Sequence, residues 1–145
     1  MKEKLYLITL VFLGCILIYA CSSSHHMNGK MQTGKYNFTL MDSANNSLAD
    51  GVLNIETAAK RNMSGTYSVT KMYVDKVNGL KSSGEFEATS DVTMKIFTIN
   101  MDPKIADANL FVNANYTGDS LNGTWYYSTM MGAQTGGNFK AALVQ

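Results

Sequence analysis

The chain has 145 residues and a formal net charge of +1, with 12 Lys and Arg residues against 11 Asp and Glu residues. This length is enough for one compact domain and not for two. The balanced charge provides neither a basic footprint for nucleic acid nor a polybasic patch for anionic lipid, so these partners are excluded first.

The chain begins with a segment of the kind that directs secretion. A short, net-basic head precedes an apolar run from Leu5 to Ala20. A basic head, an apolar run and a small residue at the cut site are typical of a signal peptide. A membrane-spanning helix needs about 20 apolar residues, which is more than this run offers. We therefore expect a signal helix over residues 1–20 that is cleaved, with an uncleaved signal anchor as the alternative.

The end of this segment carries a candidate lipidation site. The tetrapeptide Ile18-Tyr19-Ala20-Cys21 resembles the lipobox of bacterial lipoproteins, although Tyr19 stands where that motif has a small residue. The resemblance implies cleavage before Cys21 and the attachment of acyl chains, such as palmitate, to this cysteine. Cys15 is a rival site, but cleavage there would shorten the apolar run and leave apolar residues behind the anchor.

The same resemblance predicts where the protein lies in the cell. Ser22, rather than an aspartate, follows Cys21. In a Gram-negative cell this implies an exported protein held by its lipid on the periplasmic side of the outer membrane. After processing, Cys21 is the only cysteine left, so no disulfide can form within the domain.

The rest of the chain predicts a tether followed by one all-β domain. Residues 21–33 lack periodicity and read as a flexible tether, and residues 34–145 form the domain. Short alternating runs broken by Gly, Asn, Asp and Ser indicate about eight antiparallel strands. We expect them at residues 35–41, 51–57, 64–75, 80–89, 92–101, 109–117, 121–130 and 137–144. The dipeptide Asn78-Gly79 predicts a tight hairpin turn.

A Gly-x-aromatic motif recurs along these strands. It occurs at Gly34-Lys35-Tyr36, Gly65-Thr66-Tyr67, Gly84-Glu85-Phe86, Gly123-Thr124-Trp125 and Gly137-Asn138-Phe139. Residues i and i+2 share a face, so each glycine lies beside a ring on the inner surface, where it marks a bend. This predicts a strongly curved sheet, either a small up-and-down barrel or a β-sandwich. The barrel is similar in architecture alone to calycin-type proteins such as lipocalins and avidins.

Catalytic chemistry finds little support in the domain. The only histidines, His25 and His26, lie in the tether, so the domain has no base for a Ser-His-Asp or Cys-His site. Glu85 and Glu87 flank Phe86 and are expected on the outer, solvated face, although a paired-carboxylate site is the alternative. Asp102 and Asp107 lie in one expected loop and could bind calcium, but the loop lacks the pattern of a calcium-binding loop. We predict no enzyme activity, no catalytic residue, no metal and no cofactor.

The segment Trp125-Tyr126-Tyr127 is the richest aromatic cluster. Trp125 and Tyr127 are expected to face inward, where they either fill the core or line a pocket. Met130 and Met131 follow in an expected loop, Ser128–Gly136, that could act as a flap at the barrel mouth. Trp125, Tyr127, Met130 and Met131 are therefore the candidate ligand-binding residues.

Two functions from different classes follow from this pattern. The first is a lipid-anchored, non-catalytic binding or interaction module that meets another envelope protein at the barrel mouth. The second is a lipocalin-like carrier of a small lipophilic ligand inside the barrel. An interior filled by side chains favours the module, whereas an empty apolar interior favours the carrier.

Overall fold

The computed structural model describes residues 32–59, 61–91, 96–117 and 119–144. The expected signal helix, Cys21 and the tether as far as residue 31 lie outside the described residues, so those expectations stay predictions. Within the described ranges, no helix is long and apolar enough to cross a membrane.

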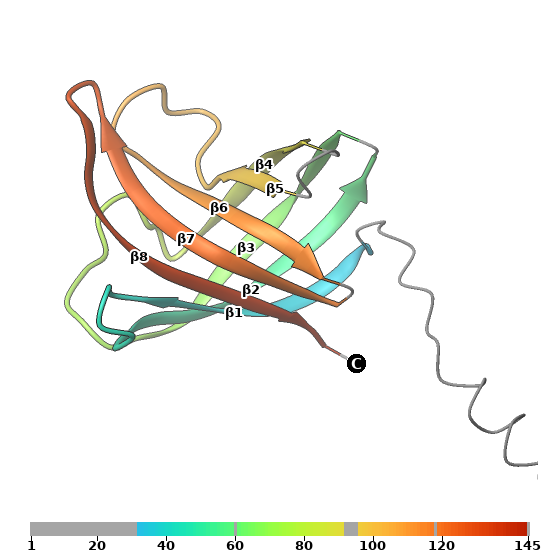
Figure 1. The fold of residues 1–145 in the computed structure, drawn as a ribbon, viewed down its shortest axis with the longest axis horizontal. Coiled ribbons are helices and arrows are strands. Elements are labelled where there is room, and N and C mark those ends of the chain that lie inside the picture. The colour runs from blue at the N-terminus through green and yellow to red at the C-terminus, as the bar shows by residue number, and fades with distance from the viewer. Residues whose placement is uncertain (1–31, 60, 92–95, 118, 145) are drawn as a thin grey trace, which may run out of the picture.

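Eight antiparallel strands follow one another around a closed barrel (Figure 1). They are β1 (Gly34–Met41), β2 (Ser47–Ala58), β3 (Asn62–Met72), β4 (Ser83–Asp91), β5 (Ile96–Asn100), β6 (Asn109–Thr117), β7 (Ser120–Thr129) and β8 (Gly132–Leu143). The first and last strands pair from Tyr36 opposite Leu143 to Met41 opposite Asn138, which closes the sheet. The predicted up-and-down barrel is therefore confirmed over the sandwich.

The barrel has two unlike ends. Four connections, residues 42–46, 73–82, 101–108 and 130–131, lie at one end, which we call the loop end. The start of β1 and the end of β8 lie at the opposite end, the terminal end (Figure 1, right). The chain thus enters the barrel on the side away from its longest loops.

Two connections differ from the sequence-based expectation. The sequence predicts a loop over Ser128–Gly136, but β7 and β8 continue through this segment and leave only Met130 and Met131 between them. Residues on both faces of this hairpin are small, polar or exposed, so no apolar alternation reveals the strands. Conversely, the turn at Asn78-Gly79 forms inside a ten-residue connection, 73–82, instead of a tight hairpin.

Side chains fill the barrel interior. Inward-facing residues of all eight strands form one buried cluster with the loop residue Val77. Its largest members include Tyr36, Phe38, Phe86 and Phe139, each at most 2% exposed. Burial raises the pKa of Tyr36 to about 12, with a further contribution from nearby Tyr116, so this phenol stays neutral inside the barrel.

The Gly-x-aromatic motifs interlock across neighbouring strands. In the pairing of β3 with β4, Gly65 lies opposite Phe86 and Tyr67 lies opposite Gly84. A Cβ atom on Gly84 would lie 2.9 Å from the Tyr67 ring, and one on Gly65 would lie 3.1 Å from the Phe86 ring. Each motif therefore supplies the ring that covers the glycine of the other.

The same register of glycine opposite ring occurs between β7 and β8. Gly123 lies opposite Phe139, and Trp125 lies opposite Gly137. A Cβ atom on Gly123 would overlap the Asn113 carbonyl oxygen and lie 2.6 Å from Cα of Ala114. The sharp curvature brings backbone atoms too close for any side chain here, which is the physical reason for glycine at this position.

We expect Gly123→Ala to destabilise the barrel by about 1–3 kcal/mol or more, because the added methyl group meets backbone that cannot move without breaking the sheet. Urea denaturation followed by tryptophan fluorescence measures this change. Thr124→Ala is the matched control on the exposed face of the same strand, and it should change the free energy of unfolding by less than about 0.5 kcal/mol. Equal stabilities for the two variants would contradict the curvature argument.

Candidate functional site

The structure separates the four residues predicted to bind a ligand. Trp125 is 4% exposed and its Nε1 donates a hydrogen bond to the Met41 carbonyl oxygen at 2.7 Å. Tyr127 is partly buried and packs against the core cluster. Met130 and Met131, by contrast, are 86% and 87% exposed at the tip of the β7–β8 hairpin. The two aromatic residues thus belong to the core, and the two methionines form a surface.

The connection between β3 and β4 covers Tyr127. Gly79 has a φ of 76°, and a Cβ atom on it would lie 2.8 Å from the Tyr127 ring and 2.9 Å from the Leu110 nitrogen. The Leu80 nitrogen donates to the Val77 carbonyl oxygen at 3.1 Å, which closes the turn around this glycine. Only a residue without a side chain lets the loop lie this close to the ring. This loop therefore covers Tyr127, one of the two rings at which the sequence analysis places a ligand pocket.

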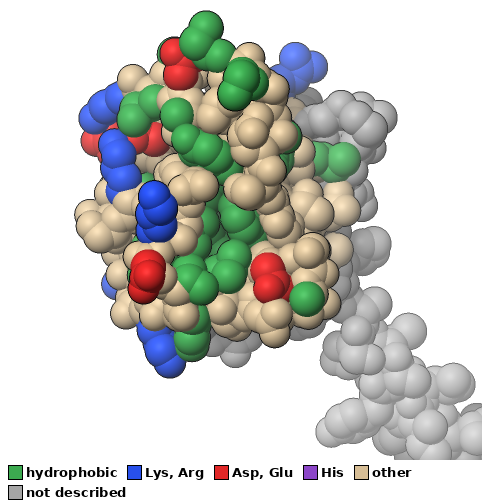
Figure 2. All heavy atoms as spheres, turned by 90° about the vertical axis from the view of Figure 1, so that its left-hand side faces the viewer, with side chains coloured by type: hydrophobic (Ala, Val, Ile, Leu, Met, Phe, Trp, Pro, Cys, Tyr) green, Lys and Arg blue, Asp and Glu red, His purple; other side chains and the backbone are tan. Residues whose placement is uncertain are grey.

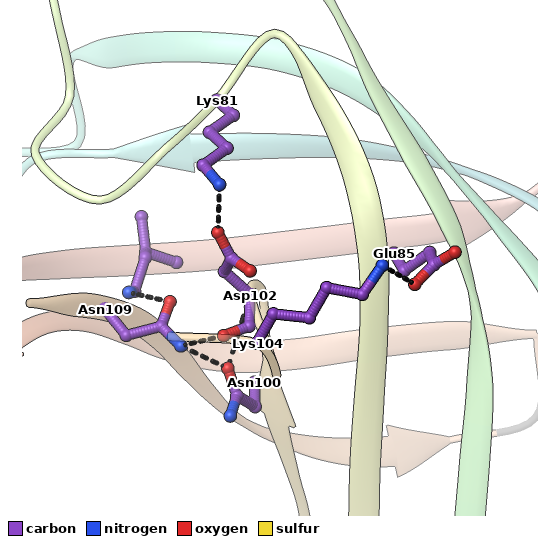
Figure 3. A network of polar contacts seen from close by, with 7 residues as sticks. Lys81, Glu85, Asn100, Asp102, Lys104 and Asn109 are labelled. Carbon is purple, nitrogen blue, oxygen red and sulfur yellow. Dashed lines mark hydrogen bonds and ion pairs between the residues drawn. The ribbon is translucent and has the colours of Figure 1, made fainter. Parts of the chain in front are cut away.

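An ion pair joins this covering loop to the next one. Lys81 Nζ contacts Asp102 Oδ2, which links the β3–β4 and β5–β6 connections (Figure 3). Asp102 is only 8% exposed, although it lies in a loop. Tyr67 lies close by, and burial raises the pKa of its phenol. Within the described ranges, no group of three or more His, Cys, Asp or Glu side chains that could hold a metal ion occurs.

The buried side chain of Asn109 holds the β5–β6 connection in place through hydrogen bonds. It is 1% exposed, and its Nδ2 donates to the Asp102 carbonyl oxygen at 2.7 Å and also to Asn100 Oδ1 (Figure 3). Its Oδ1 accepts from the Leu110 nitrogen at 2.7 Å. Because every arm of this buried amide is used, the loop that carries Asp102 has one fixed position.

The loop end collects the exposed hydrophobic side chains. Among the described residues, seven large hydrophobic side chains are strongly exposed: Met72, Tyr73, Val74, Ile105, Met130, Met131 and Val144. All but Val144 lie at the loop end. Figure 2 looks onto this end and shows a hydrophobic band through its centre, with charged residues toward its margins. Large exposed apolar patches are typical of interaction sites.

Tyr73 is the most firmly held member of this surface. It is 46% exposed, and its hydroxyl donates to Asp50 Oδ2 at 2.7 Å. Lys71 Nζ lies 4.2 Å from the ring centroid, in cation–π contact. Tyr73 is not among the residues predicted to bind, because its exposure depends on the fold of the long loop 73–82. The sequence feature that could have pointed to Tyr73 is the apolar run Met72-Tyr73-Val74 beside a polar loop.

Glu85 and Glu87 lie on the exposed outer face of β4, as expected. Lys104 Nζ binds Glu85 Oε2 at 2.8 Å, and this contact raises the pKa of Lys104 (Figure 3). The two glutamates therefore do not face each other across a cleft, which the paired-carboxylate alternative requires.

The chain matches no known family model, no curated protein and no solved structure.

We expect Lys81→Met to loosen the covering loop, because it leaves the largely buried Asp102 carboxylate without its cation. The loss should be about 0.5–1 kcal/mol, which corresponds to amide hydrogen exchange about two- to fivefold faster at residues 77–80. Lys104→Met removes a comparable but more exposed pair with Glu85 and should leave this exchange unchanged. Equal acceleration in both variants would show that the Lys81 pair does not fasten the loop.

Proposed function

We propose that this protein is a lipid-anchored, non-catalytic interaction module of the bacterial cell envelope, which binds a partner protein through its loop end. The single observation that carries the proposal is the gathering of six exposed hydrophobic side chains at that end. Methionines at an adaptable tip and a fixed, exposed tyrosine are residue types that protein interfaces favour.

The position of the anchor supports this choice of surface. The chain enters β1 at the terminal end, so a lipid on Cys21 would hold that end toward the membrane. The 13 residues of the tether, 21–33, can span at most about 45 Å when extended. The loop end would then face away from the membrane, where a partner protein can reach it.

The filled interior favours the module over the lipophilic carrier. A carrier needs a cavity, whereas the centre of this barrel holds Phe38, Phe86 and Phe139 in close packing. The covering loop at Gly79 and Val77 adds a further obstacle at the mouth. Native mass spectrometry of the detergent-extracted chain separates the two functions, since a carrier would retain a reproducible extra mass on the domain.

We expect Cys21→Ala to abolish membrane anchoring by lipid. The unaltered chain should incorporate labelled palmitate and partition into detergent, and Cys21→Ala should do neither. Cys15→Ala is the matched control and should behave like the unaltered chain. If the label is lost with Cys15→Ala and kept with Cys21→Ala, the lipidation site lies at Cys15. If neither substitution removes it, the lipoprotein proposal is wrong.

A paired substitution, Met130→Ser with Met131→Ser, tests the loop end. Both side chains are more than 80% exposed, so the free energy of unfolding should change by less than about 0.5 kcal/mol. A photoreactive residue at position 105 of the full chain should crosslink one discrete partner in intact cells, and the paired substitution should reduce the yield at least fivefold. The same probe at Asn37, on the outer face of β1, is the control. An equal yield from both probe positions would refute the proposed surface.

A further inference from the structure

A groove crosses the outer wall of the barrel, on a different surface from the loop end. It has a volume of about 640 Å³ and lies over β3, β4, β5 and β6. Its lining includes Asn62, Ser64, Glu87, Thr98, Asn100 and Phe111. We propose that this groove binds a neutral glycan chain, a function separate from the docking of a partner protein at the loop end.

Strand register arranges the groove as a straight row of side chains. Ser64 pairs with Glu87, Glu87 with Asn100, and Asn100 with Phe111. Neighbouring strands lie about 4.8 Å apart, so the row extends over roughly 15 Å. An extended chain of several sugar rings can therefore lie across the strands and meet each side chain in turn.

An aromatic platform stands at one end of this row. Phe111 and its cross-strand partner Tyr126 stack outside the barrel, with centroids 5.5 Å apart and planes inclined by 21°. The faces of aromatic rings carry partial negative charge, which attracts the polarised C–H groups on the flat side of a pyranose. A single stacked pair is too little apolar surface for a protein partner, which needs a larger hydrophobic centre.

The row also includes a hydrogen-bond donor, the Asn100 amide nitrogen, whose orientation is fixed before a ligand binds. Asn100 Oδ1 accepts from the Asp102 nitrogen at 3.0 Å and also from Asn109 Nδ2. Its own amide nitrogen points away from this network (Figure 3). The buried Asn109 thus fixes the orientation of the Asn100 amide, so ligand binding need not order it. Threonine, serine and asparagine side chains along the groove both donate and accept, as sugar hydroxyls do.

The charge of the groove selects a neutral chain over an anionic one. Among the described residues that line it, Glu87 is the only charged one. In the described part of the chain Glu87 has no ion-pair partner, whereas the nearby Glu85 is paired with Lys104. An uncompensated carboxylate repels uronates, phosphates and nucleic acids, and it accepts hydrogen bonds from neutral hydroxyls.

The test is an NMR titration of the full-length, ¹⁵N-labelled chain in detergent micelles. The probes are the neutral hexamers of N-acetylglucosamine and of glucose, with hexagalacturonate as the anionic comparison. At least one neutral hexamer should shift the amides of Ser64, Glu87, Asn100 and Phe111, and hexagalacturonate should bind at least tenfold more weakly. The result does not depend on a partner protein, so it can fail while the proposed function stands.

Two variants localise the binding. Phe111→Ala should weaken binding of the neutral hexamer at least tenfold. Asn62→Ala should weaken this binding about threefold. Because the Asn62 side chain is exposed, its loss leaves the fold intact, so weaker binding by this variant does not come from unfolding. Tyr73→Ala removes an exposed ring at the loop end and should change nothing. The proposal is overturned if neither neutral hexamer shifts the row, if Tyr73→Ala removes the binding, or if the anionic hexamer binds equally well.

Discussion

The contact between an inward glycine and the aromatic ring opposite it is the constraint on which this barrel depends. Closing eight strands around a narrow interior forces neighbouring backbones together, and the glycines mark where this occurs. β3 and β4 exchange these contacts reciprocally, and β7 and β8 place glycines opposite rings in the same register. A shift of register by one residue would expose both rings and leave both glycines uncovered, so the same contacts also fix the register.

A core built in this way is filled by side chains, so the surfaces that a ligand or partner can reach lie on the outside of the barrel. The rings that cover the glycines occupy the space in which a carrier would hold its ligand. The polar network around Asn109 contributes to two outer surfaces at once. It fixes the loop that carries Asp102 at the loop end, and it orients Asn100 on the wall. These two surfaces therefore share one structural support.

Apolar alternation predicted the class of fold and most strand positions. Residues 109–117 form a strand with the predicted bounds, because every second side chain is apolar and buried. The hairpin beyond Tyr127 was mispredicted as a loop, since both faces of its strands meet solvent and alternation has no cause there. The sequence also did not predict which of the candidate binding residues are exposed. Trp125 and Met130 look alike as candidate contacts, but only the folded barrel places the first in the core and the second at an exposed tip.

The indole of Trp125 lies at the seam where the barrel closes. Its hydrogen bond reaches the Met41 carbonyl oxygen, 84 residues earlier in the chain. Pairing between β7 and β8 is local and can form early, whereas contacts between β1 and β8 need almost the whole domain to be in place. Because this is the only tryptophan of the chain, its fluorescence reports the last, long-range step of folding separately from the formation of the hairpin that carries it.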